Sequence, residues 1–114
     1  MKMDQGLWLL RKIKEEKRQR REEQRKELLQ QASLKLESYF RQKGVTEAYF
    51  FGSLTREDMF YEWSDVDIVV SHEEGHYFYM LSELERLLKR DVHLIELKRC
   101  PFAERVRHEG IRII

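Results

Sequence analysis

The sequence contains few residues that break or cross-link a chain: one cysteine, one proline and five glycines among 114 residues. The single cysteine, Cys100, excludes an intrachain disulfide and any cysteine-rich zinc site. No apolar run approaches the roughly 18 residues that a membrane-spanning helix needs. Residues 7–10 are apolar but are followed at once by Arg11, and no small-residue cleavage site of a signal peptide follows. We therefore expect a cytosolic protein that has no membrane partner.

The charge of the chain is unevenly distributed along its length. A net charge of +1, with 41% hydrophobic and 38% charged residues, suits one small globular domain. Residues 1–43 hold 13 Lys and Arg against 7 Asp and Glu, whereas residues 44–114 hold 9 against 14. The first segment therefore carries +6 and the second −5, so a basic arm and an acidic body should attract different partners.

Residues 5–43 predict one long helix, because they contain no proline and only Gly6 interrupts the helix-forming residues. Between residues 11 and 27 the only apolar residue is Ile13, which is typical of a solvated, charge-laced helix. From Leu28 onward apolar residues recur at helical spacing and should face a core. We therefore divide the chain into a basic helical N-terminal arm, 1–27, and a domain, 28–114, and end the helix at Gly44.

After Gly44 the pattern alternates between strands and helices. The expected strands are 48–51, 66–70, 92–97 and 111–114, and the expected helices are 76–89 and 101–110, the latter starting at Pro101. This order predicts an α/β (α+β) fold, with helices packed on a small mixed β-sheet and a long helix preceding it.

Two short motifs carry the chemistry. Gly52 and Ser53 follow a strand, where free backbone N–H groups and a hydroxyl would face an anion, and glycine lets a phosphate approach closely. Asp65 and Asp67 share one face of the next strand, an arrangement that is expensive unless a cation bridges them. A hard divalent ion such as Mg²⁺ is the natural occupant. An anion cradle beside an acidic metal site is what nucleotidyl transfer requires.

This combination, Gly-Ser, a spacer and Asp-x-Asp at the head of an apolar strand, resembles the signature of the DNA-polymerase-beta-like nucleotidyltransferase superfamily. The short chain resembles its minimal nucleotidyltransferase (MNT) branch. The resemblance implies that Gly52 and Ser53 bind the phosphates of ATP, and that Asp65 and Asp67 bind the catalytic Mg²⁺. It also implies that Arg56, just after the serine, steadies the triphosphate.

The sequence departs from that pattern in two places. The spacer, residues 54–64, is one residue longer than the usual minimal form. More importantly, His93 stands on the following strand where the family places a third carboxylate that binds metal and accepts the proton. Histidine can act as a general base near neutral pH but is a poor Mg²⁺ ligand. Asp91, two residues earlier on the same strand face, could substitute, and the sequence leaves open whether the site is active.

A chain this small has no room for an acceptor-selecting domain, so we expect its acceptor to be another protein or to be delivered by one. The resemblance implies a HEPN-type ribonuclease toxin as partner, with the chain acting as an antitoxin that transfers AMP to it. The rival interpretation, motivated by His93, is a catalytically impaired binding module that neutralises its partner by occlusion.

The arm admits three interpretations. It could pair with a second copy through Leu7, Leu10 and Ile13, giving a homo-oligomer, or it could dock on a partner protein. RNA binding is favoured by the charge of +6 on residues 1–43 but opposed by the seven acids interleaved in that segment.

Two histidines, His72 and His76, share the i,i+4 spacing that zinc sites use. No third ligand of the right kind lies nearby in the sequence. We therefore interpret both as surface residues.

Overall fold

The fold is built on one four-stranded mixed sheet. The computed structural model of the chain describes residues 2–71 and 76–114. The strands are β1 (Ala48–Phe51), β2 (Val66–Val70), β3 (Val92–Glu96) and β4 (Ile111–Arg112). Their order is β3-β2-β1-β4, with β1 antiparallel to both β2 and β4, and β2 parallel to β3. The expected class, a small mixed sheet with helices, is confirmed.

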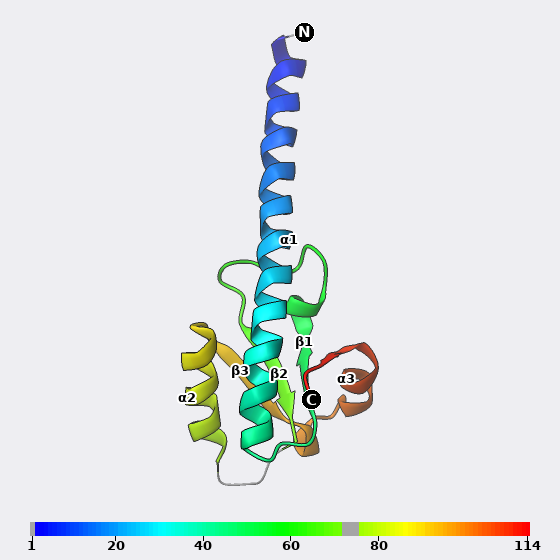
Figure 1. Ribbon diagram of the computed structural model, residues 1–114. Helices are drawn as coiled ribbons and strands as arrows, with labels where there is room; N and C mark the ends of the chain where they lie inside the picture. The colour runs from blue at the N-terminus through cyan, green and yellow to red at the C-terminus, as the bar shows by residue number, and fades with distance from the viewer. Residues whose placement is uncertain (1, 72–75) are drawn as a thin grey trace.

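The first helix, α1 (Lys2–Gln42), dominates the shape of the molecule. At 1.5 Å per residue it is about 60 Å long, and its N-terminal part stands clear of the sheet (Figure 1). It ends as expected before Gly44, which has a positive φ of 74°. Within the described residues no helix has the length and apolarity needed to cross a bilayer.

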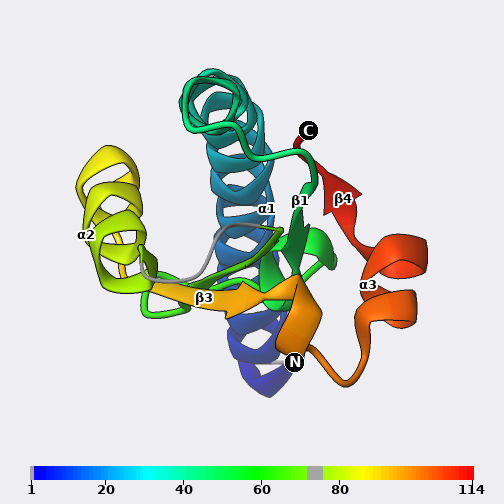
Figure 2. The ribbon, with the colours of Figure 1, turned by 90° about the horizontal axis from the view of Figure 1, so that it is seen from below.

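Helices cover both faces of the sheet (Figure 2). The C-terminal part of α1 and α2 (Tyr77–Leu88) pack on one face, and the main core lies there. Its largest fully buried side chains from the helices and strands include Leu36, Phe40, Phe50, Ile68 and Leu84. The other face carries a smaller cluster beneath α3 (Ala103–Glu109), formed by Tyr49, Val69, Leu97, Cys100 and Val106. In β2, which lies between these two faces, Asp67 is the one polar residue, and the other four residues are buried.

The last helix begins later than the sequence predicts. Pro101 and Phe102 form a turn, and α3 starts at Ala103, so the expectation that Pro101 opens the helix is wrong. The backbone of Cys100 is extended, with φ −82° and ψ 115°, because a residue before proline is disfavoured in the helical region. Cys100 itself is buried. Gly110 caps the helix as expected, through its N–H to the carbonyl of Val106 at 2.8 Å.

Other boundaries differ by one or two residues, which is ordinary for element ends. β3 ends at Glu96 because Leu97 begins a short 3-10 helix, Leu97–Arg99. β4 ends at Arg112, although the Ile113 N–H still donates to the Ala48 carbonyl.

The charged half of α1 is not solvated throughout. Arg25 is only 7% exposed, so the expectation of a solvated helix over residues 11–27 is wrong at this residue. The apolar residues Leu7, Leu10 and Ile13 are exposed. The division at residue 27, and the pairing, docking or RNA-binding roles of the arm, stay predictions.

Candidate nucleotide-binding site

The predicted site residues gather where β1 ends and β2 and β3 begin. A short 3-10 turn, η1 (Gly52–Thr55), follows β1 directly. In the strand register Phe51 lies opposite Asp67, and Asp67 lies opposite His93. Three adjacent strands therefore bring η1, Asp67 and His93 together at one end of the sheet.

Gly52 lies directly against the carboxylate of Asp67. Its φ is +73°, a conformation that L side chains rarely adopt. A Cβ atom at this position would collide with Asp67 Oδ2 and would lie 3.2 Å from Cγ. Only glycine therefore allows this backbone to approach the acidic side chain so closely.

Asp67 is half-buried, with 27% of its side chain exposed. Burial raises the pKa of its carboxyl above the usual value, His93 opposes that shift through its charge and hydrogen bond, and Asp65 adds to it by repulsion. His93 Nδ1 lies 3.3 Å from Asp67 Oδ1. Because 63% of the His93 side chain is exposed, it can contact a ligand and Asp67 together.

The remaining acidic residues lie at the rim. Asp65 is exposed just before β2, and Asp91 is exposed just before β3. Their backbones are adjacent, because the Val66 N–H donates to the Asp91 carbonyl at 3.0 Å. Both line an open hollow of about 330 Å³ together with Glu62, Trp63, Ser64, Lys89 and Arg90. Asp91 thus lies near Asp65, whereas His93 occupies the position beside Asp67.

The two other predicted phosphate contacts lie on η1 and just after it. Ser53 is partly buried within the turn, and its carbonyl accepts the Arg56 N–H at 3.2 Å. Arg56 is exposed. The pKa of the Glu109 carboxyl is lowered mainly by its hydrogen bond from Arg105, and the nearby guanidinium of Arg56 adds a smaller effect of the same sign.

The donor set fits a magnesium ion that arrives with a nucleotide. Across residues 2–71 and 76–114, no three His, Cys, Asp or Glu side chains form a ready-made metal cage. Mg²⁺ does not need one, because it keeps several waters and takes one or two carboxylates plus phosphate oxygens. Asp65 and Asp67 would supply the two carboxylates, and a cation would relieve their mutual repulsion.

Of the two histidines at i,i+4 spacing, His76 is exposed, whereas His72 lies outside the described residues.

Sequence reasoning missed residues of α1 that contact η1 and the loop after it. Arg25 Nη1 donates to the Leu54 carbonyl at 3.0 Å, and Glu22 Oε2 accepts the Asp58 N–H at 3.0 Å. Glu22 and Arg25 have the i,i+3 spacing of an ordinary surface ion pair, so no signal in the sequence distinguishes them.

A mixed sheet with a Gly-Ser turn packed against an aspartate near the end of an inner strand is the arrangement of a nucleotidyltransferase-type domain. The chain belongs to the family described as Polymerase beta, Nucleotidyltransferase, whose family profile matches residues 34–114. This confirms the resemblance to the DNA-polymerase-beta-like nucleotidyltransferase superfamily. No curated protein was found to match the chain.

Solved toxin–antitoxin structures share the fold. One, described as a toxin-antitoxin with AMP-PNP, is 21% identical, with a TM-score of 0.60 over 72% of each chain. A structure of MntA-HepT is 20% identical, with a TM-score of 0.55 over 75% of this chain and 71% of that one. A mutant of MntA-HpeT is 19% identical, with a TM-score of 0.59 over 72% and 71%. At these identities the likeness shows the fold.

Proposed function

We propose that the protein is a Mg²⁺-dependent nucleotidyltransferase that transfers AMP from ATP to a HEPN-family toxin and thereby acts as its antitoxin. The observation that carries this proposal is the packing of the Gly52 backbone against Asp67, beside His93 in register on the next strand. The similar solved structures are toxin–antitoxin complexes, and one contains the ATP analogue AMP-PNP.

The residues divide the work between the two halves of the nucleotide site. The N–H groups of η1 and the Ser53 hydroxyl hold phosphate oxygens, and the exposed Arg56 guanidinium adds positive charge. Asp65 and Asp67 would hold Mg²⁺, which when bound neutralises charge on the phosphates. The acceptor hydroxyl attacks the α-phosphorus, its new O–P bond forms, and the bond to the β-phosphate oxygen breaks to release pyrophosphate.

His93 would act as the general base of that reaction. Its Nδ1 contacts Asp67 Oδ1, which orients the ring, and its exposed edge faces outward where an acceptor can approach. An imidazole near neutral pH can take the proton from the attacking hydroxyl as the O–P bond forms. His93 would then do by general-base chemistry what a third carboxylate does elsewhere in the family.

Labelled ATP tests the proposal. The protein is mixed with its HEPN partner, Mg²⁺ and ATP labelled either at the α-phosphate or at the γ-phosphate. We expect the partner to acquire only the α-label, and to acquire none with Asp67→Asn. Transfer of the γ-label would indicate phosphoryl transfer, and no transfer, or equal transfer by Asp67→Asn, would refute the enzymatic proposal.

One observation favours a second candidate, an impaired module that neutralises its partner by occlusion. His93 replaces a hard oxygen ligand by a nitrogen that Mg²⁺ binds poorly. His93→Asp separates the two candidates. Stronger Mg²⁺-ATP binding together with a gain of transfer would identify a decayed site, whereas loss of transfer would show that the histidine is functional.

A further inference from the structure

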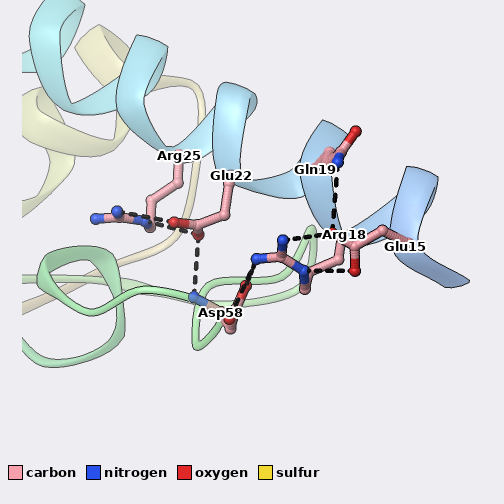
Figure 3. Close-up of polar contacts among 6 residues, drawn as sticks. All are labelled: Glu15, Arg18, Gln19, Glu22, Arg25 and Asp58. Carbon is pink, nitrogen blue, oxygen red and sulfur yellow. Dashed lines mark hydrogen bonds and ion pairs between the residues drawn. The ribbon is translucent and has the colours of Figure 1, made fainter.

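A network of charged side chains connects α1 to the loop beyond the nucleotide-binding turn (Figure 3). Arg25 Nε and Nη2 donate to the two carboxylate oxygens of Glu22, each at 3.0 Å. Both side chains are largely buried, 8% exposed for Arg25 and 13% for Glu22. The pair therefore lies against the body of the protein rather than in solvent.

The third nitrogen of the Arg25 guanidinium reaches the turn itself. Nη1 donates to the carbonyl of Leu54 at 3.0 Å, in a bond buried from solvent. Leu54 belongs to the Gly52–Thr55 turn, and its side chain is fully buried in the main core. The turn is thus held from two directions, by its apolar side chain and by a charged donor on α1.

Glu22 holds the far side of the same loop. Its Oε2 accepts the backbone N–H of Asp58 at 3.0 Å (Figure 3). Asp58 has a positive φ of 60°, which is uncommon for a residue other than glycine and needs support from its surroundings. Arg18 adds a more exposed contact, from Nη1 to Asp58 Oδ1 at 3.2 Å. The segment after Gly52 is therefore anchored at Leu54 and again at Asp58.

Burial of this ion pair costs free energy, and only further hydrogen bonds to groups outside the helix can offset that cost. Removing two charges from water is repaid only when the geometry is good and the remaining donors are paired. Another pair on the same helix, Arg41 and Glu37, lies 65% and 44% exposed and avoids that cost. Glu22 and Arg25 are buried at the point where they contact the loop, and both precede residue 34, where the family match begins.

We propose that Arg25 and Glu22 are positioning residues for the triphosphate. They fix the Gly52–Thr55 turn and the loop to Asp58, so that the N–H groups of the turn keep the orientation that phosphate oxygens require. The turn has few bonds of its own, among them Thr55 Oγ1 to the Gly52 carbonyl at 2.7 Å. This inference rests on the proposed nucleotide site and assigns part of that site to the long helix.

Calorimetry on the full chain tests this role with two probes, Mg²⁺-ATP and Mg²⁺-tripolyphosphate. Arg25→Met keeps the length of the side chain but removes the donors, and Arg41→Met removes an exposed arginine from the same helix as the matched control. We expect both probes to bind Arg25→Met roughly tenfold more weakly, the effect of one hydrogen bond from a charged donor. Arg41→Met should bind both as the wild type does.

A purely structural role gives a different result. It would lower the melting temperature of Arg25→Met but leave the dissociation constants of the folded protein unchanged, and that result would overturn the inference. Glu22→Gln is the second variant, since it keeps an acceptor for the Asp58 N–H while weakening the ion pair. It should weaken binding less than Arg25→Met does, and a larger loss than in Arg25→Met would also contradict the inference.

Hydrogen exchange without nucleotide separates this inference from the proposed function. If wild-type protein binds neither probe, the nucleotidyltransferase proposal fails. The exchange of residues 52–58 still reports on whether Arg25 and Glu22 hold this segment in place. We expect these amides to exchange faster in Arg25→Met than in Arg41→Met, while β1 stays protected in both. Equal exchange in the two variants would overturn the positioning role.

Discussion

Asp67 and His93 lie side by side on adjacent parallel strands, with Asp67 Oδ1 3.3 Å from His93 Nδ1. The register makes them direct neighbours, and His93 opposes the rise in the pKa of the Asp67 carboxyl that burial causes. Each side chain also has a distinct exposure: Asp67 is half-buried and His93 points into solvent. In the proposed mechanism, the pair would join a carboxylate that binds the metal to a group that meets the acceptor.

We predict that His93→Ala lowers the rate of AMP transfer by about a hundredfold, the lower end of what general-base catalysis contributes. Binding of Mg²⁺-ATP should change little, because the carboxylates and the phosphate turn remain. Asp91→Asn is the matched control, since Asp91 lines an open hollow together with Asp65, whereas the residue in register with Asp67 is His93. Single-turnover rates check the prediction, and a larger defect in Asp91→Asn would assign the third role to that carboxylate instead.

Gly52→Ala should abolish nucleotide binding, because the new methyl group would displace the Asp67 carboxylate. Gly44→Ala is a close control: its φ of +74° matches the +73° of Gly52, but a methyl group there would meet no atom within 4 Å. Both variants should lose roughly 1–2 kcal/mol of stability from left-handed backbone strain. Thermal unfolding and Mg²⁺-ATP titration measure the two effects, and retained binding in Gly52→Ala would contradict the assigned geometry.

Removal of residues 1–13 should leave Mg²⁺-ATP affinity within about twofold of the full chain, a change below roughly 0.5 kcal/mol. The reason is that the contacts from α1 to the loop begin at Arg18, beyond the deleted segment. Titration of the shortened chain checks this, and a large loss of affinity would extend the site into the arm.

Sedimentation of both forms tests the pairing of two copies through Leu7, Leu10 and Ile13, which predicts that only the full chain self-associates.

Glu47 should make stability depend on pH. Its Oε2 accepts hydrogen bonds from Arg107 Nε at 2.9 Å and from the Tyr49 hydroxyl at 2.6 Å, and these contacts lower the pKa of the Glu47 carboxyl. A lowered pKa in the folded state stabilises the protein above the ordinary glutamate pKa, and the effect disappears as pH falls through the folded value.

Glu47→Gln should therefore cost about 1 kcal/mol at pH 7, and progressively less as the pH falls below the ordinary glutamate pKa. Denaturant unfolding over a series of pH values from 7 downward measures this difference. Glu104→Gln is the control, because Glu104 pairs with the same arginine but is 92% exposed. An equal effect of both substitutions at pH 7 would contradict the stabilising role assigned to Glu47.

Much of the fold and of the site follows from local patterns in the sequence. The buried strand around Val69 and the turn at Gly52 are marked by residue type, and adjacent strands bring Asp67 and His93 together without further information. The burial of Arg25 could not be predicted, because a buried and an exposed i,i+3 ion pair have the same sequence pattern. What separates them is the loop that packs over one of them, and loop placement depends on tertiary contacts.

The start of α3 shows the same limit on a smaller scale. Proline at the first turn of a helix is common, but Pro101 instead lies in a turn that follows a short 3-10 helix, Leu97–Arg99. Leu97 is buried in the smaller core cluster, and that packing determines where the chain can turn. Local preference therefore placed the helix correctly to within two residues but not its first turn.

Titration of ATP into wild-type protein and Asp67→Asn, each with and without Mg²⁺, tests the central claim most directly. Asp67→Asn preserves the shape of the side chain beside Gly52 and removes its charge, so the backbone contact should persist while the metal ligand is lost. We expect wild-type protein to bind one ATP only when Mg²⁺ is present, and Asp67→Asn to bind at least tenfold more weakly, a loss of about 1.4 kcal/mol. Equal binding by both proteins, or ATP binding that does not respond to Mg²⁺, would contradict a nucleotidyltransferase site at Gly52 and Asp67.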